Sequence, residues 1–141
     1  MTALAWRAAT LADVPLLARW NMELNEDEGH PPWMEPTGYA TRMAGFLERE
    51  GYAATLFEIA GTPIGYALHR REPEGQFLRQ FYIARDRRRS GLGRAAFALL
   101  RGKVWPRGVP LGLDVLSGNA RGFAFWRSLG FRDHATRLVL K

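Results

Sequence analysis

Cysteine is absent from this sequence. Its absence excludes disulfide bonds, thiolate metal ligands and any reaction that passes through a cysteine acyl-enzyme. Long apolar runs are also missing: no stretch approaches the roughly 18 residues of a membrane-spanning helix, and residues 1–14 carry no signal-peptide core. We therefore expect a cytoplasmic protein without a membrane partner.

Lysine is scarce, because Lys103 and Lys141 are the only lysines among 20 basic residues. The formal net charge is nonetheless +6. This arginine excess indicates either a compositional bias of the source genome or an anionic partner: a nucleic acid, a phosphorylated cofactor or an acidic lipid. Arginine suits phosphate because its planar group donates two parallel hydrogen bonds. One basic cluster stands out: Arg85, Arg87, Arg88, Arg89 and Arg94.

The chain is long enough for one domain over 1–141, and five Trp and eight Phe supply bulk for its core. Apolar periodicities predict the order strand, two helices, three antiparallel strands, helix, strand, helix, strand. This order indicates an α/β (α+β) sandwich with a mixed, mainly antiparallel sheet and about four helices. The predicted strands cover 6–9, 52–59, 64–69, 77–83, 109–116 and part of 131–140; the predicted helices cover 14–24, 37–50, 92–104 and 120–129, and 25–36 is a loop.

The strongest local feature is a strand, a basic loop, Gly91-Leu92-Gly93 and then a helix. Glycine lacks a Cβ, so the backbone can turn tightly here and approach a ligand closely. The first N–H groups of a helix have no intrahelical partner and lie at the positive end of its dipole, so they suit a phosphate or pyrophosphate. A solvated arginine-rich turn is the plainer interpretation, but the flanking strand, helix and arginines favour an anion site.

Gly91-x-Gly93-x-x-Ala96 also fits a dinucleotide-binding fingerprint, with Asp114 at a suitable distance downstream. Three features disfavour that interpretation. A long basic loop separates Ile83 from Gly91, the unit follows an antiparallel run of strands, and Asp114 is expected in mid-strand, where it would not reach a ribose. We expect Asp114 to be structural.

The segment Arg88-Arg89-Ser90-Gly91-Leu92-Gly93 resembles the (Gln/Arg)-x-x-Gly-x-(Gly/Ala) motif of the GNAT superfamily of N-acetyltransferases. A second match, Asn119-Ala120, Phe125-Trp126 and Leu129-Gly130-Phe131, resembles the later family motif in which Asn starts a helix that ends in Leu-Gly-Phe. The motif spacing and the element order match over essentially the whole chain. The resemblance implies direct transfer of an acetyl group from acetyl-CoA to an amine, with no covalent enzyme intermediate and no metal.

The resemblance also implies roles for single residues. The backbone of Phe81, Tyr82 and Ile83 would pair with the pantetheine arm in a splayed strand pair, and one of these N–H groups would stabilise the oxyanion. Asn119 would contact the pantetheine arm, unless it is a simple helix N-cap. The pyrophosphate would lie in a segment that we name the cofactor loop: Arg88, Arg89, Ser90, Gly91, Leu92, Gly93 and Arg94.

Trp126 departs from the family pattern. Many members carry a Tyr at this position, whose hydroxyl can protonate the departing thiolate. An indole N–H donates a hydrogen bond but is not a useful acid, so we expect Trp126 to be a packing wall of the cofactor site.

The sequence offers no evident general base. Some relatives carry a Glu in the strand at 76–80, and this chain has none there. The acidic segment 26–30 lies where the family has its acceptor-side wall, so Glu28 and His30 are the candidates for a base or for anchors of a cationic acceptor. The alternative is a solvated loop. Trp33 would either line the same region or pack into the core, and we expect His69 on the surface of its strand.

Two other functions stay open. A nucleic-acid-binding module is disfavoured, because the basic residues gather at one loop and no RNP-like aromatic motif occurs. A domain that binds acyl-CoA as a sensor, without catalysis, would fit the missing Tyr and the missing base. The expected partner is an amine, either a small molecule or a protein amino group, and not a nucleic acid. The sequence leaves monomer and homodimer open.

Overall fold

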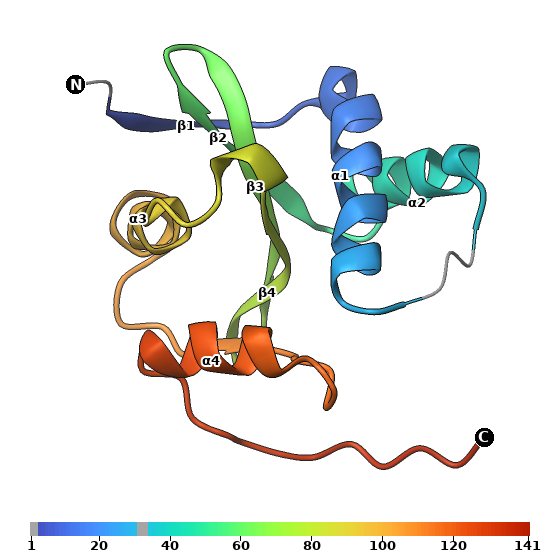
Figure 1. The fold of residues 1–141 in the computed structure, drawn as a ribbon, viewed down its shortest axis with the longest axis vertical. Coiled ribbons are helices and arrows are strands. Elements are labelled where there is room, and N and C mark those ends of the chain that lie inside the picture. The colour runs from blue at the N-terminus through green and yellow to red at the C-terminus, as the bar shows by residue number, and fades with distance from the viewer. Residues whose placement is uncertain (1–2, 31–33) are drawn as a thin grey trace.

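The computed structural model describes residues 3–30 and 34–141. Within them lies a sheet with the strand order β1-β2-β3-β4-β5, in which β5 runs parallel to β4 and the other neighbours are antiparallel (Figure 1). The predicted mixed, mainly antiparallel sheet is therefore confirmed. The strands are β1 Leu4–Ala8, β2 Ala53–Ile59, β3 Thr62–Glu72, β4 Gly75–Ile83 and β5 Leu111–Leu113.

Helices pack on both faces of the sheet (Figure 1). The helices α1 Val14–Asp27 and α2 Pro36–Glu48 cover one face, and α3 Leu92–Leu99 and α4 Ala120–Ser128 lie against the other. Two 3-10 turns, Leu11–Asp13 and Arg85–Arg87, precede α1 and α3, and a π-helical turn, Leu100–Val104, extends α3. None of the helices in the described ranges is long and apolar enough to cross a membrane.

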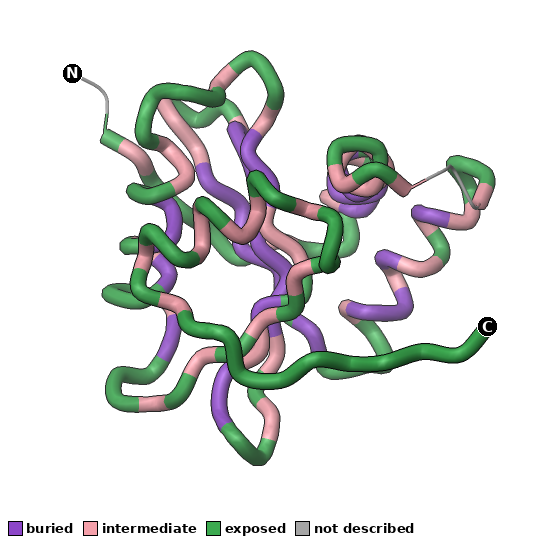
Figure 2. The backbone as a smooth tube through the Cα atoms, turned by 60° about the horizontal axis from the view of Figure 1, so that its bottom comes forward, coloured by how far each residue is buried: buried purple, intermediate pink, exposed green. Residues whose placement is uncertain are grey.

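Each face of the sheet has its own apolar core, and the buried residues concentrate on the strands and on the inner sides of the helices (Figure 2). The core on the α1 side contains Leu17, Trp20, Met43, Phe46, Leu56, Tyr66, Leu68 and Tyr82. The core on the α3 side contains Phe57, Ile64, Ala67, Leu78, Ile83, Phe97, Leu100 and Trp105. Side chains alternate along a strand, so β4 contributes to both cores.

Strand β4 separates from β5 part of the way along its length. It pairs with β3 as far as Ile83, but with β5 only at 76–78. The register between β4 and β3 shifts close to the point where β4 separates from β5. His69 lies opposite Leu78, whereas Leu68 lies opposite Gln80. Arg79 is thus the extra residue of a β-bulge, which bends a strand and increases its twist. The predicted splayed strand pair is present.

Three differences between the predicted and the observed elements bear on the site. Helix α1 continues to Asp27, so Glu26 and Asp27 lie on a helix and not in a loop. Strand β5 ends at Leu113, so Asp114 follows the strand instead of lying within it. The predicted last strand does not form: residues 131–141 run away from the sheet, and without a neighbouring strand they cannot build a ladder (Figure 1).

His69 is buried and not on the surface as expected, because β3 is a central strand covered on both faces. Its Nε2 lies 2.9 Å from the Thr55 hydroxyl, and its ring packs edge-on against Trp105 with 5.5 Å between the ring centroids. Burial lowers the pKa of His69 from 6.5 to about 4.

This buried histidine predicts a loss of stability in weak acid. Between pH 6.5 and pH 4 the unfolded chain binds a proton at His69 and the folded chain does not, so the free energy of unfolding falls as the pH decreases. From pH 7 to pH 5 the loss attributable to His69 is about 2 kcal/mol. Urea denaturation of wild type and His69→Asn at both pH values measures it, as the difference between their pH dependences.

His134→Asn is the matched control, because it removes an imidazole that is exposed to solvent instead of buried. This variant should keep the wild-type pH dependence. An equal pH dependence in wild type and His69→Asn would contradict the assignment of this loss of stability to His69.

Candidate active site

The outer edge of β4, from Arg79 to Ile83, forms one side of the candidate site. The Ala84 N–H donates to the Ile64 carbonyl on β3 at 2.8 Å. Backbone groups alternate in direction along an antiparallel strand, so the N–H groups of Phe81 and Ile83 point to the opposite edge, which β5 leaves unpaired. Of the three residues predicted to bind the pantetheine arm, Phe81 and Ile83 therefore present their N–H groups there, and Tyr82 does not.

The start of α3 forms the second part of the site. Gly91 is its N-cap residue with φ +78°, and no side chain caps the helix. The first intrahelical bond runs from the Ala95 N–H to the Gly91 carbonyl at 3.1 Å, so the N–H groups of Leu92, Gly93 and Arg94 remain available to an anion. A Cβ built at Gly91 would meet no heavy atom within 4 Å outside the adjoining residues, so a side chain at this position would project into open space.

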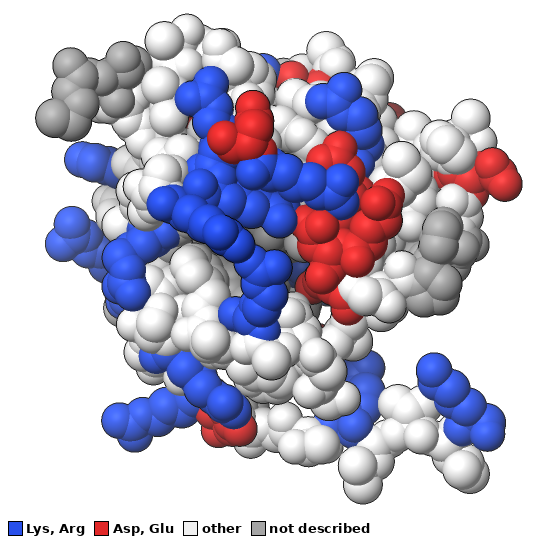
Figure 3. Space-filling model, viewed as in Figure 1, with Lys and Arg blue, Asp and Glu red and all other residues white. Residues whose placement is uncertain are grey.

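The arginines of the cofactor loop do not all face the same way. The Arg88 Nε donates to the Ile83 carbonyl at 2.8 Å, and its Nη2 donates to Asp27 on α1 at 2.6 Å. The Arg94 guanidinium donates to the Ser128 hydroxyl on α4 at 3.1 Å. Arg89 is exposed and has φ +63°. A basic patch lies near the centre of this face of the molecule with an acidic patch directly beside it, and further basic side chains are scattered around them (Figure 3).

Asn119 and Trp126 serve the packing of α4. The Asn119 side chain accepts a hydrogen bond from the Gly122 N–H at 2.9 Å, so it acts as the N-cap. Trp126 is half-buried and meets Phe81 and Phe97 edge-on, at centroid distances of 5.4 and 5.6 Å. Its contacts are those of a wall between β4 and α3. The Ser90 hydroxyl is likewise engaged locally, since it donates to the Arg87 carbonyl.

Glu28 and His30 lie together at the end of α1, where Glu28 is the C-cap residue and both are half-buried. Burial raises the pKa of Glu28 above its ordinary value of 4.5, and the charge of His30 opposes that rise. Burial raises the pKa of the Tyr66 hydroxyl, and the nearby Glu28 carboxylate adds to the effect. Glu28 therefore faces the α1 side of the sheet. Trp33 lies outside the described residues.

Tyr66 and Gln80 are site residues that the sequence analysis missed. The Tyr66 hydroxyl donates to Gln80 Oε1 at 2.7 Å. Tyr66 lies opposite Tyr82, so Tyr66, Gln80 and Tyr82 share the face of the sheet that α1 covers. The alternation of β3 and β4 was visible in the sequence, but the bulge at Arg79 was not. Unless the bulge is known, the sequence does not tell on which face of the sheet Gln80 lies.

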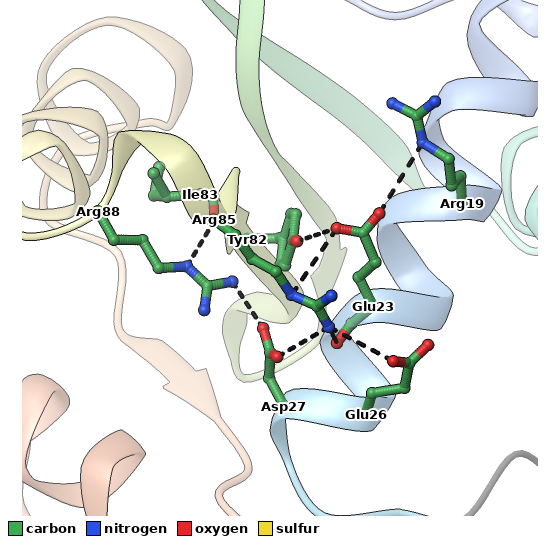
Figure 4. A network of polar contacts seen from close by, with 8 residues as sticks. All are labelled: Arg19, Glu23, Glu26, Asp27, Tyr82, Ile83, Arg85 and Arg88. Carbon is green, nitrogen blue, oxygen red and sulfur yellow. Dashed lines mark hydrogen bonds and ion pairs between the residues drawn. The ribbon is translucent and has the colours of Figure 1, made fainter.

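A polar network joins the end of α1 to the end of β4 (Figure 4). The Tyr82 hydroxyl donates to Glu23 at 2.6 Å. The Arg85 guanidinium contacts Asp27 at 3.0 Å and Glu26 at 3.5 Å. Asp27 thus accepts from Arg85 through one carboxylate oxygen and from Arg88 through the other. This network escaped prediction because residues 25–27 were expected in a loop. In the described ranges, no group of three or more His, Asp or Glu residues could hold a metal ion.

The sequence matches the acetyltransferase (GNAT) family over residues 17–131. No curated protein matches it. Among solved structures, an acetyltransferase from Thermus thermophilus is similar at 24% identity and a TM-score of 0.76, over 92% of this chain and 87% of that chain. A predicted acetyltransferase with acetyl-CoA from Clostridium acetobutylicum is similar at 17% identity and a TM-score of 0.76, over 99% and 96% of the two chains.

The aminoglycoside N-acetyltransferase AAC(6')-Iy in complex with CoA is similar at 14% identity and a TM-score of 0.76, over 100% of this chain and 95% of that chain. At these identities the structural likeness establishes the fold. The family match is independent of that likeness and covers most of the sequence. The chain therefore belongs to the acetyltransferase (GNAT) family.

Proposed function

We propose that residues 1–141 form one N-acetyltransferase domain that transfers the acetyl group of acetyl-CoA directly to an amine. This proposal rests on two sets of backbone N–H groups that are available to a ligand. The outer edge of β4 at Phe81 and Ile83 leads toward the uncapped N-terminus of α3 at Gly91. An extended amide-containing arm with a pyrophosphate at its end matches such a pair of sites.

The backbone at the start of α3 fits this donor substrate. The pantetheine arm would lie along β4 as an additional strand, and the pyrophosphate would accept from the N–H groups of Leu92, Gly93 and Arg94. AAC(6')-Iy in complex with CoA and the Clostridium acetobutylicum protein with acetyl-CoA have the same fold, which supports this donor. Gly93 has a separate reason to be glycine, because a Cβ there would meet the Phe125 ring of α4 at 3.3 Å.

The acceptor would approach from the α1 side, where Glu28 and His30 lie. A neutral amine nitrogen attacks the thioester carbonyl, a C–N bond forms, the C–S bond breaks and CoA leaves as a thiolate. The N–H of Phe81 or Ile83 would stabilise the developing oxyanion. Glu28 would take the amine proton, since its raised pKa brings it closer to that of a useful base. Water would protonate the thiolate, because Trp126 cannot.

The test is release of free thiol from acetyl-CoA in the presence of a panel of amines that includes diamines, aminoglycosides and peptides with free amino groups. We expect thiol release that depends on both substrates, with an acetylated amine of matching amount detected by mass spectrometry. Binding of acetyl-CoA without turnover of any amine would instead identify an acyl-CoA-binding sensor. Failure to bind acetyl-CoA at all would contradict both functions.

Replacing Gly91 with valine should weaken acetyl-CoA binding by at least tenfold. The β-branched side chain would project into the open space before the helix N-terminus and would also resist a φ of +78°. Calorimetry with acetyl-CoA measures the effect. Gly108→Val is the matched control, since Gly108 has φ +75° and equally open surroundings after α3. Equal acetyl-CoA affinity in Gly91→Val and wild type would refute the donor site.

Replacing Trp126 with phenylalanine should leave most of the maximal rate. The side chain packs among aromatic rings and donates no proton in the proposed reaction, so the change costs packing and not chemistry. Steady-state kinetics at saturating amine measures it. A loss of about a hundredfold, with acetyl-CoA affinity intact, would mean that the indole takes part in acid catalysis after all.

Replacing Glu28 with glutamine, or His30 with alanine, should lower the turnover number or raise the Michaelis constant for the amine. Acetyl-CoA affinity should stay nearly unchanged, because both residues lie on the acceptor side. Glu74→Gln is the matched control, an exposed carboxylate beside the turn between β3 and β4. If Glu28→Gln and His30→Ala both keep wild-type kinetics for the amine, the segment is a solvated loop and the base lies elsewhere.

A further inference from the structure

We propose that Arg88 is a positioning residue that fixes the acceptor side of the site relative to the donor side. This inference rests on the proposed function, because it assigns the outer edge of β4 to acetyl-CoA and the end of α1 to the amine. It differs from the role that the sequence suggested for Arg88, which was contact with the pyrophosphate.

The guanidinium of Arg88 reaches two parts of the site at once. Its Nε donates to the carbonyl of Ile83, the last residue of β4, at 2.8 Å. Its Nη2 donates to Asp27, the last residue of α1, at 2.6 Å. It also lies over the Tyr82 ring, 5.0 Å from the centroid. These three contacts give the side chain a defined direction, toward Asp27 and Ile83.

Asp27 transmits this arrangement to the proposed base. Glu28 follows Asp27 directly and ends the helix, so the position of the Asp27 carboxylate constrains where the Glu28 backbone can lie. Arg85 holds the other oxygen of Asp27 at 3.0 Å, and Glu23 one turn earlier accepts from the Tyr82 hydroxyl. The last turn of α1 is thereby attached to the end of β4 through separate contacts, all visible in Figure 4.

The bridge needs the shape of arginine and not only its charge. The planar guanidinium directs Nε and Nη2 toward different partners, whereas a lysine ammonium is a single point and cannot donate in both directions at these distances. Arg88→Lys therefore separates two roles. A residue that only contacts the pyrophosphate could be replaced by lysine, because the positive charge remains. A positioning bridge would not.

The experiment compares Arg88→Lys, Asp27→Asn and the double variant in an assay where the wild type already acetylates an amine. Each single variant should lower kcat/KM for the amine by about tenfold, which is modest beside the hundredfold that misplacement by 1 Å can cause. The dissociation constant of acetyl-CoA, measured by calorimetry, should stay within about threefold. The double variant should be no worse than the worse single variant, because both changes break the same bridge.

Glu26→Gln is the matched control. It removes the same charge one residue earlier and loses a contact to Arg85 but none to Arg88, so its effect reports what charge alone contributes. An effect as large as that of Asp27→Asn would overturn the proposal. Wild-type kinetics for the amine in Arg88→Lys would also overturn it, and would leave the acetyltransferase activity standing. Circular dichroism and thermal melts verify that each variant is folded.

Discussion

The unpaired outer edge of β4 is the constraint on which the site depends. A backbone N–H that is withdrawn from water without a partner costs free energy, so an open strand edge in a protein interior needs something to pair with. In this fold β5 pairs with only 76–78, and the bulge at Arg79 turns the rest of β4 away from it. The aromatic rings of Phe81, Phe125 and Trp126 then fill the layer between β4 and α4. They pack on β4 from the α4 side, and β5 pairs with no residue of β4 beyond Leu78.

Because its side chains alternate, β4 faces both sides of the sheet, and in the proposed reaction it would contact both substrates. Gln80 and Tyr82 point to the α1 side, where Tyr66, Glu23 and the end of α1 are found. Phe81 and Ile83 point to the core beneath α3 and α4, and their N–H groups face the open edge. One strand therefore connects the two sides with no hinge between them. The tight contact of β3 with β4 contributes to this rigidity, since a Cβ at Gly65 would collide with the Tyr82 carbonyl.

The sequence predicted the features that arise from local chemistry. The N-cap at Asn119, the helix that begins after Gly91 and the order of elements up to β5 follow from residue types and periodicity, and the structure has them. Features that depend on distant contacts were missed. To predict that His69 is buried, one must know that β3 is a central strand. To predict the face of the sheet on which Gln80 lies, one must know of the bulge at Arg79. The last strand was predicted over part of 131–140, yet Leu138, Val139 and Leu140 are exposed, because this segment has no neighbouring strand.

The charge count of the sequence overstates the positive potential that a phosphate would meet. Arg85 and Arg88 lie against Asp27, with Glu23 and Glu26 close by, so a large part of the cluster is neutralised by the end of α1 (Figure 3). An arginine in contact with a carboxylate presents no net charge at a distance, and salt screens what remains of its field beyond roughly 8 Å. In the proposed donor site, the backbone donors at the start of α3 would add an attraction whose direction the helix fixes. The basic cluster that draws attention in the sequence thus also joins the end of α1 to the end of β4 and to the turn that follows it, through Arg85 and Arg88.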